Sequence, residues 1–325
     1  MRRILTANSF DRFLLPAGLV LALGVAILFP EAERDIRRLM IVPLDQCLIW
    51  LIFFISGIRL NLSHLWEERV TSTILLPSIT AQFVLAPFCG FWLGVLLSLP
   101  DAWFIGLAAI CCAPTTLSSG VVLTRQAEGN ELLALLLTLT LTLIGSLISP
   151  ALFGLLLGVG VSISLPITSL VIKLFILVLI PLALGQFARK VFFRNPPEYL
   201  KHLPSICVIL TVWLATHTNT ESLTKLPWYA WIAFPSFSLT LHGLWFAALW
   251  QFGKIAELHY RIRIALSIVG SQKTLPLALT LLTAGFAGSP LAGELSAAIA
   301  FVVVFHLTQI LLDSILAPYL AENHQ

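Results

Sequence analysis

Long apolar stretches separated by short polar segments run along the whole chain. Ten of these stretches are each close to the ~20 residues that an α-helix needs to cross a bilayer. They cover residues 13–30, 40–58, 72–98, 102–125, 130–158, 167–188, 203–220, 228–252, 260–285 and 294–319. The pattern therefore predicts an all-α polytopic membrane protein with ten transmembrane helices.

The composition agrees with this prediction and excludes other classes. Of the 325 residues, 58% are hydrophobic and 11% charged, whereas a soluble protein carries about 25% charged residues. There is no Gly-rich phosphate loop, no His-Glu-x-x-His helix and no Gly-x-Ser-x-Gly elbow, so we expect neither an enzyme nor an organic cofactor. No basic cluster is interleaved with aromatic residues, which argues against nucleic acid as a partner. The expected surroundings are the lipid bilayer, and the sequence carries no signature of an oligomeric state.

The distribution of lysine and arginine predicts the orientation. With the N-terminus in the cytoplasm, thirteen of the nineteen basic residues fall in cytoplasmic segments and four in outer loops. Cytoplasmic loops of membrane proteins are enriched in these residues. We therefore expect both termini in the cytoplasm, in a bacterial-type inner (plasma) membrane.

Two spans are interrupted by polar residues at corresponding places. Residues 114–120 interrupt the fourth span and residues 270–276 the ninth, and a shift of 156 places Leu123 and Thr124 on Leu279 and Thr280. Halves of five spans each must have opposite orientations, and paired interruptions in inverted halves indicate the binding site of a secondary transporter. The sequence thus predicts two inverted five-helix repeats, with two broken helices that cross at the midplane.

The first interruption concentrates hydroxyl groups at one turn. Its candidate site residues are Thr115, Thr116, Ser118, Ser119 and Gly120. Hydroxyl oxygens and freed carbonyls suit a hard cation or a polar substrate. The alternative is that these hydroxyls only bond to backbone within the helix bundle. The flanking proline and glycine favour a site.

The second interruption carries a cation in the middle of an apolar span. Its candidate residues are Ser271, Gln272, Lys273 and Thr274. An intramembrane lysine needs a partner or a water-lined cavity. The alternative is a side chain that snorkels to the headgroups, but Lys273 lies far from both ends of the span.

Other intramembrane polar residues are open to two interpretations. Gln82 in the third span either joins two helices by a hydrogen bond or faces the site. His306, Gln309 and Asp313 in the tenth span lie three and four residues apart, on one helix face. Either they relay protons or they form an inter-helix network. We favour a network near the cytoplasmic end, because Pro318 is expected to end the span.

Three short motifs resemble the bile acid:sodium symporter family. They are Ala81-Gln-Phe with Pro87 five residues after Gln82, Ser118-Ser-Gly-Val-Val-Leu-Thr124 followed by Gly129-Asn130, and Ser271-Gln-Lys-Thr-Leu275. The last two are most similar to a divergent branch labelled sodium-dependent transporter. The resemblance covers nearly the whole chain.

The resemblance implies a division into two domains. Spans 1, 2, 6 and 7 would form a panel domain, residues 1–71 and 159–227. Spans 3–5 and 8–10 would form a core domain, residues 72–158 and 228–325. Family members bind an amphipathic organic anion between panel and core, which implies a small organic anion as substrate.

The resemblance also implies two sodium sites behind the crossover. Ser119 and Thr138 correspond to ligands of the first sodium ion, and Gln82 and Gln272 to ligands of the second. Sodium is therefore the one ion that we consider as a cofactor.

Several departures from the family pattern weaken the case for sodium. Gly120 replaces an asparagine, Ala134 a serine, and Ile268 an acidic residue that bridges both sodium ions. Cation affinity depends strongly on ligand charge, so the loss of that carboxylate matters. Lys273 adds a positive charge where sodium would bind, and at about 4–6 Å it would repel a cation in a poorly screened cavity.

The expected function is secondary active transport of an amphipathic organic anion by alternating access, with sodium coupling left open. One alternative is a proton-coupled or uncoupled carrier that uses Lys273 in place of a bound cation. Another is a non-transporting regulatory membrane protein with the same fold.

Overall fold

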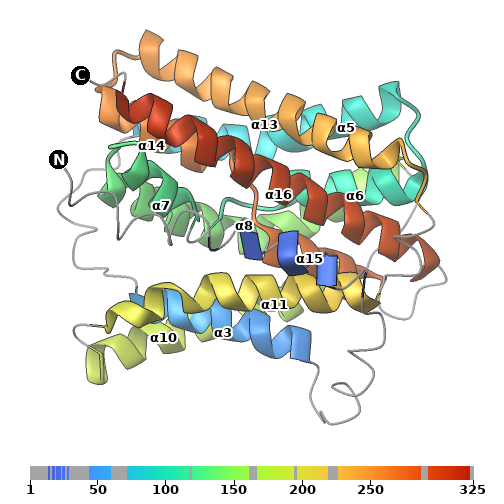
Figure 1. Cartoon of the computed structure of the whole chain (residues 1–325), viewed down its shortest axis with the longest axis horizontal. Coiled ribbons are helices and arrows are strands. Elements are labelled where there is room, and N and C mark those ends of the chain that lie inside the picture. Colours follow the sequence, from blue (N-terminus) through green and yellow to red (C-terminus); the bar gives the residue numbers. More distant parts are fainter. Residues whose placement is uncertain are drawn as a thin grey trace. The chain divides into compact units, whose positions relative to one another are not determined.

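The computed structural model describes residues 44–59, 72–116, 119–160, 167–193, 196–218, 226–286 and 292–322, with separate positions between 14 and 28. Regular structure in this part of the chain is helical throughout (Figure 1). The elements are α3 (Leu44–Arg59), α4 (Ser72–Thr80), the π-helical turn η2 (Ala81–Leu85), α5 (Ala86–Leu96), α6 (Asp101–Cys112), α7 (Ser119–Gln126), α8 (Glu131–Gly160), α9 (Ile167–Leu174), the π-helical turn η3 (Phe175–Leu179), α10 (Ile180–Val191), the short helical turn η4 (Glu198–Lys201), α11 (Leu203–Thr218), α13 (Ala230–Ile255), α14 (Tyr260–Ser271), α15 (Leu275–Gly285) and α16 (Ala292–Glu322).

Within the described residues, six helical segments are long and apolar enough to cross a membrane. They are Ser72–Leu96, Glu131–Gly160, Val171–Val191, Ala230–Ile255, Tyr260–Gly285 and Leu295–Glu322. Two shorter apolar helices, Gln46–Arg59 and Asp101–Cys112, lie at other predicted spans. The chain is an integral, multi-pass membrane protein. The number of ten helices and the inverted repeat stay predictions, and the predicted span 13–30 lies mostly outside the described residues.

The chain divides into two compact units. The first is Met1–Leu60 with Phe175–Leu226, and the second is Asn61–Leu174 with Pro227–Gln325. Their assignment as panel and core stays a prediction.

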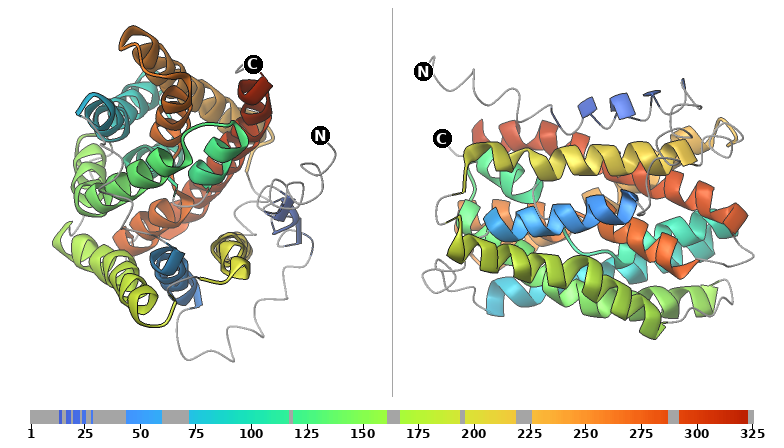
Figure 2. Two further views of the ribbon diagram at one scale, coloured as in Figure 1. Left: turned by 90° about the vertical axis from the view of Figure 1, so that its left-hand side faces the viewer. Right: turned by 90° about the horizontal axis from the view of Figure 1, so that it is seen from below.

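In the first unit, α3 lies against both α10 and α11 (Figure 2). Glycines let the backbones of α3 and α10 approach closely. A Cβ at Gly57 would lie 2.3 Å from Leu182 O, and one at Gly185 only 2.1 Å from Phe54 O. Small residues are the usual way for membrane helices to pack without a hydrophobic driving force. Polar groups reinforce the contact, since Arg189 Nη1 donates to Ile58 O at 2.8 Å.

In the second unit, the two interrupted spans are enclosed by continuous helices. Helix α16 packs against α6, α13 and α15, and α14 packs against α13, α7 and α8 (Figure 1). The segment Tyr260–Gly285 is the most enclosed of the six candidate spans, because its most apolar window is fully buried. A helix surrounded by protein can carry polar residues that lipid would not tolerate.

Local sequence explains where these two spans break. Ala113 precedes a proline, which disfavours the helical conformation, and it is extended with ψ of 144°. In the other span, Pro276 has no N–H to donate to the carbonyl four residues earlier, that of Gln272. Gln272 and Thr274 are both extended, with ψ of 150° and 128°.

The expectation that Pro318 ends the tenth span is wrong. Helix α16 continues through Pro318 to Glu322, and α4, α8 and α13 likewise contain an internal proline. A proline removes one helical hydrogen bond, and a helix can bend rather than stop at that point. Asp313 is therefore nine residues from the end of its helix, not beside it.

We predict that Gly106→Ala destabilises the second unit. A Cβ at this position in α6 would lie 2.8 Å from Ala298 O and 2.9 Å from Phe301 Cβ, so α16 would have to shift. Overpacking of this kind typically costs about 1–3 kcal/mol. Thermal unfolding in detergent measures the effect as a lower Tm.

Gly243→Ala is the matched control. Nothing lies within 4 Å of a Cβ built at Gly243 in α13, so the change should leave Tm equal or higher. Equal melting temperatures for the two variants would contradict the close packing of α6 on α16.

Candidate functional site

The two interruptions contact each other inside the second unit. Thr274 N donates to Pro114 O at 2.8 Å, which joins the non-helical segment between α14 and α15 to the one after α6. Both residues are deeply buried. The helix ends at the two breaks thus meet in the protein interior. Hydrogen-bond partners for their unpaired backbone groups must therefore come from the protein itself.

The Lys273 side chain is completely buried and ends at three backbone carbonyls. Its Nζ donates to Gln82 O at 2.9 Å, and to Cys111 O and Ala113 O at 3.0 Å each. An ammonium has three N–H donors, so the three acceptors match the charged form of the side chain. The Trp245 ring, with its centroid 5.4 Å from Nζ, adds a cation–π contact.

These carbonyls are available because the local helices leave them unpaired. Gln82 lies in η2, where Ala86 N–H is directed to Ala81 O. With the same five-residue spacing, Gln82 O would pair with the N–H of residue 87. Residue 87 is a proline and has no N–H, so Gln82 O is left without a helical partner. Cys111 lies in the last turn of α6, where carbonyls lack a helical partner and carry the negative end of the helix dipole.

The Gln82 side chain caps the C-terminal end of α14. Its Nε2 donates to Gly270 O at 2.8 Å and to Gln272 O at 2.9 Å, and it lies 3.3 Å from Val269 O. Gln272 O is the carbonyl that Pro276 cannot pair. A single amide therefore takes over most of the bonds that the break in the helix removes.

Gln272 joins the hydroxyls of the first interruption to the second. Its Oε1 accepts a short hydrogen bond from Thr116 Oγ1 and lies 3.2 Å from Ser119 Oγ. Ser119 Oγ donates to Thr116 Oγ1 at 2.7 Å, and Gly120 N donates to that same hydroxyl at 3.1 Å. A Cβ on residue 120 would lie 3.2 Å from Gln272 Oε1, which explains how glycine fits there.

The other end of the Gln272 amide meets a buried carboxylate. Gln272 Nε2 donates to Asp313 Oδ2, and Asp313 Oδ1 lies 2.8 Å from His242 Nε2. His242 Nδ1 in turn lies 3.2 Å from Ser271 O. All of these side chains are buried. Both ring nitrogens of His242 thus face acceptors, so a protonated His242 would form a buried ion pair with Asp313.

Helix α16 also binds the backbone of Lys273. Gln309 Oε1 accepts from Lys273 N at 3.1 Å, while Gln309 Nε2 donates to Lys273 O at 2.6 Å. His306 Nδ1 lies 2.9 Å from the same carbonyl. The Gln309 side-chain amide therefore replaces both backbone hydrogen bonds that a continuous helix would have given Lys273.

The structure brings most of the predicted site residues together. Gln82, Thr116, Ser119, Gly120, Gln272 and Lys273 belong to one hydrogen-bonded cluster, and Thr274 joins it through its backbone. Ser271 Oγ instead bonds within its own helix, to Ser267 O at 2.7 Å. Thr115 and Thr138 are buried, and their hydroxyls have no partner among the described residues. Ser118 lies outside the described residues.

The proposed sodium ligands fit a cation only in part. Gln82 Oε1 and Thr138 Oγ1 are buried acceptors without a partner in the described part of the chain. Gln272 Oε1, by contrast, already accepts from the Thr116 hydroxyl, and a cation would have to displace that hydrogen bond. Ile268, at the position of the family's bridging acid, packs in an apolar cluster with Leu123 and Ala127. The sodium assignment stays a prediction.

Sequence reasoning missed several partners of the crossover. Neither His242 nor Trp245 could be assigned to the site from the sequence, although a histidine in an apolar span is itself a signal. The inter-helix network of His306, Gln309 and Asp313 is confirmed, but its predicted location near the end of the span is wrong. The side chains on that face of α16 instead reach the crossover.

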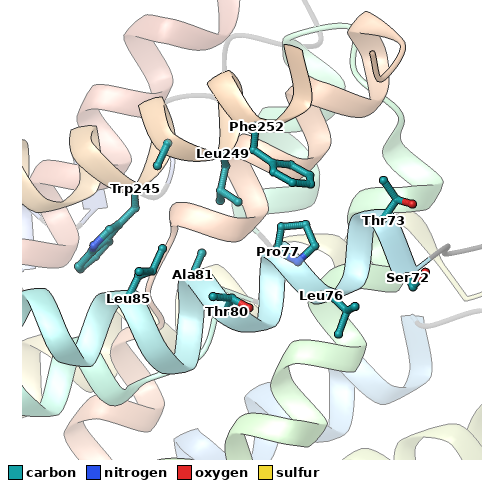
Figure 3. Close-up of a pocket in the computed structure, with 11 residues that line it drawn as sticks. Ser72, Thr73, Leu76, Pro77, Thr80, Ala81, Leu85, Trp245, Leu249 and Phe252 are labelled. Atoms are coloured by element: carbon teal, nitrogen blue, oxygen red, sulfur yellow. The ribbon is translucent and has the colours of Figure 1, made fainter. Parts of the chain in front are cut away.

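An apolar groove lies in the second unit beside this cluster, between α4–η2 and α13. Its volume is about 520 Å³. In Figure 3, Leu249 and Phe252 of α13 face Pro77 and Ala81 across it. None of the predicted site residues lines the groove. Trp245 does, and its ring is also the one that lies against the Lys273 ammonium.

Interrupted helices that meet in the interior of a multi-pass membrane protein are typical of secondary transporters. The comparison with known families gives the same class. The chain belongs to the SBF-like CPA transporter family, whose model matches residues 11–322. The resemblance expected from the sequence is confirmed, and the chain is a transport protein rather than an enzyme.

Named relatives come from plants and vertebrates. The chain is 28% identical over 332 residues to "Probable sodium/metabolite cotransporter BASS4, chloroplastic" of Oryza sativa subsp. indica, covering 96% of this chain and 76% of that protein. It is 27% identical over 337 residues to the protein of the same name in Arabidopsis thaliana, covering 96% and 73%. It is 29% identical over 317 residues to "Sodium/bile acid cotransporter 7" of Mus musculus, covering 93% and 90%.

We predict that Gln82→Leu strongly destabilises the second unit. The change keeps the apolar stem but leaves the carbonyls of Gly270 and Gln272 without their donor. Each buried carbonyl left unpaired costs about 1–3 kcal/mol, so the loss should be roughly 2–6 kcal/mol. Thermal unfolding of the purified protein in detergent measures it.

Gln251→Leu is the matched control for this substitution. Gln251 is exposed on α13, so its loss should change stability by less than about 0.5 kcal/mol. If the two variants melted at the same temperature, the capping role of Gln82 would be wrong.

Proposed function

We propose that this transporter is a secondary active carrier that moves an amphipathic organic anion across the membrane by alternating access. The observation that carries the proposal is the contact between the two interrupted helices, in a chain of this transporter family. Broken helices supply unpaired backbone groups and oriented dipoles in the membrane interior, and transporters use such places to bind their cargo.

The substrate class is supported by the names of the relatives. One group is named for bile acids, which are amphipathic anions, and the other for metabolites. Identities of 27–29% leave ample room for a different cargo, so the proposal extends to the class of organic anion only.

The proposal assigns the crossover residues as the centre of the transport site. They are Thr115, Thr116, Ser118, Ser119, Gly120, Ser271, Lys273 and Thr274. It further includes ten helices in two inverted repeats, both termini in the cytoplasm, and a bacterial-type inner membrane. The excess of basic residues in the segments predicted to be cytoplasmic supports this orientation.

Sodium coupling is the part of the proposal with the weakest support. The relatives are named as sodium cotransporters, and buried acceptors at Gln82 and Thr138 favour a cation. The Thr116 hydroxyl that already donates to Gln272 Oε1 argues against it. A proton-coupled or uncoupled cycle remains the alternative.

Flux in proteoliposomes tests the function. The purified protein is reconstituted, loaded with an unlabelled bile acid, and supplied outside with the labelled compound. Other organic anions that raise Tm in a stability screen are assayed in the same way. A carrier should show exchange accelerated by the internal anion, because a loaded carrier returns faster than an empty one.

Two variants make this test specific to the site. Gln272→Ala removes the amide that joins the Thr116 hydroxyl to Asp313 and should reduce exchange at least ~10-fold, if the lost hydrogen bonds are worth about 1.4 kcal/mol or more to the cycle. Gln251→Ala, on the exposed face of α13, should transport like the wild type. Absence of exchange with the bile acid and with every stabilising anion would contradict a carrier function.

A further inference from the structure

We propose that the Lys273 ammonium is a built-in cation: it fills a three-carbonyl cation site at the crossing of the broken helices, so that this site takes no external alkali ion. The inference deepens the proposed function by naming how one ion position of the carrier is occupied.

The ligands around Nζ are those of an ion site. Its three acceptors are all backbone carbonyls, at 2.9–3.0 Å, and they come from two separate segments, η2 and the end of α6. Carbonyl oxygens gathered from helix ends are ligands that hard monovalent cations also use in transporters.

The ammonium joins the break between α14 and α15 to two other segments, η2 and the end of α6. Lys273 belongs to the break between α14 and α15, and its charge draws together Gln82 O, Cys111 O and Ala113 O. Each contact is a charge-assisted hydrogen bond, which is stronger than one between neutral groups. These three hydrogen bonds, called the Lys273 clamp below, hold the segments together as a bound ion would. Unlike a bound ion, the ammonium cannot be lost to solution.

Charge considerations exclude a second cation at this place. The nearest carboxylate in the hydrogen-bond network is that of Asp313, and it contacts Gln272 and His242 rather than the three carbonyls. An alkali ion bound to the same carbonyls would lie against the ammonium in a poorly screened interior and be repelled.

The test removes the ammonium and asks whether free cations replace it. Lys273→Met keeps an apolar stem but lacks the terminal nitrogen, so three carbonyls face a space of about one atom. We expect the Tm of this variant to rise by roughly 3 °C or more when sodium or potassium chloride replaces choline chloride at equal ionic strength. The wild type should change by less than about 1 °C under the same exchange.

Lys254→Met is the matched control, because Lys254 is exposed on α13 of the same unit. It should behave like the wild type in all three salts. This comparison separates an ion bound at the vacated position from a general effect of salt on a protein that has lost one positive charge.

A second variant covers the case in which Lys273→Met does not fold. Lys273→Ala removes three carbons and the nitrogen, and n-propylammonium supplies the same atoms. Folded protein recovered with n-propylammonium, and not with the uncharged n-propanol, supports the built-in cation. Equal results with the two compounds overturn it.

The remaining outcomes are also decisive. The inference is overturned if the Tm of Lys273→Met is the same in the alkali and choline salts, or if sodium specifically stabilises the wild type while the variant is indifferent. These measurements use stability, not flux. They therefore stand or fall separately from the transport assay, whose failure would remove the proposed function alone.

Discussion

A helix that breaks inside a membrane leaves backbone carbonyls that neither water nor lipid can pair. The second unit of this protein depends on how that constraint is met. Each unpaired carbonyl costs several kcal/mol in hydrocarbon, so the break persists only where other helices supply donors. Gln82 supplies them for Gly270 and Gln272, His242 contacts the carbonyl of Ser271, and Gln309 pairs both backbone groups of Lys273.

The same constraint accounts for the buried lysine. An ammonium is costly in a membrane interior unless its donors find acceptors, and broken helices present acceptors in excess. Lys273 is therefore not an isolated charge to be explained apart from the breaks. Its ammonium donates to carbonyls of η2 and α6, and Asp313 contacts Gln272 and His242. The burial of this charge and the pairing of the backbone are two results of one arrangement.

Much of this arrangement could be predicted from the sequence. The apolar spans, the two polar interruptions and the importance of Lys273 follow from local residue patterns, because hydrophobic length and intramembrane charge are local properties. The partners could not be predicted in the same way. Pro276 and Pro318 both lack an N–H, yet only the first lies at a break. Near Pro276 the freed carbonyl meets Gln82, which is 190 residues away in the chain. Whether a proline breaks or merely bends a membrane helix thus depends on donors that only the fold brings near.

The Lys273 clamp also limits which parts of the second unit can move. Separation of the two breaks would require the charge-assisted hydrogen bonds from Lys273 to Cys111 O and Ala113 O to part, each worth about 1.5–3 kcal/mol, together with the contact between Thr274 and Pro114. A bound sodium ion can leave such a site and loosen it during every cycle. A covalently attached ammonium cannot diffuse away, so the crossover keeps its structure whether or not cargo is present. A transport cycle in this protein would therefore have to move the crossover as one body, with its cargo exposed to either side by motion outside it.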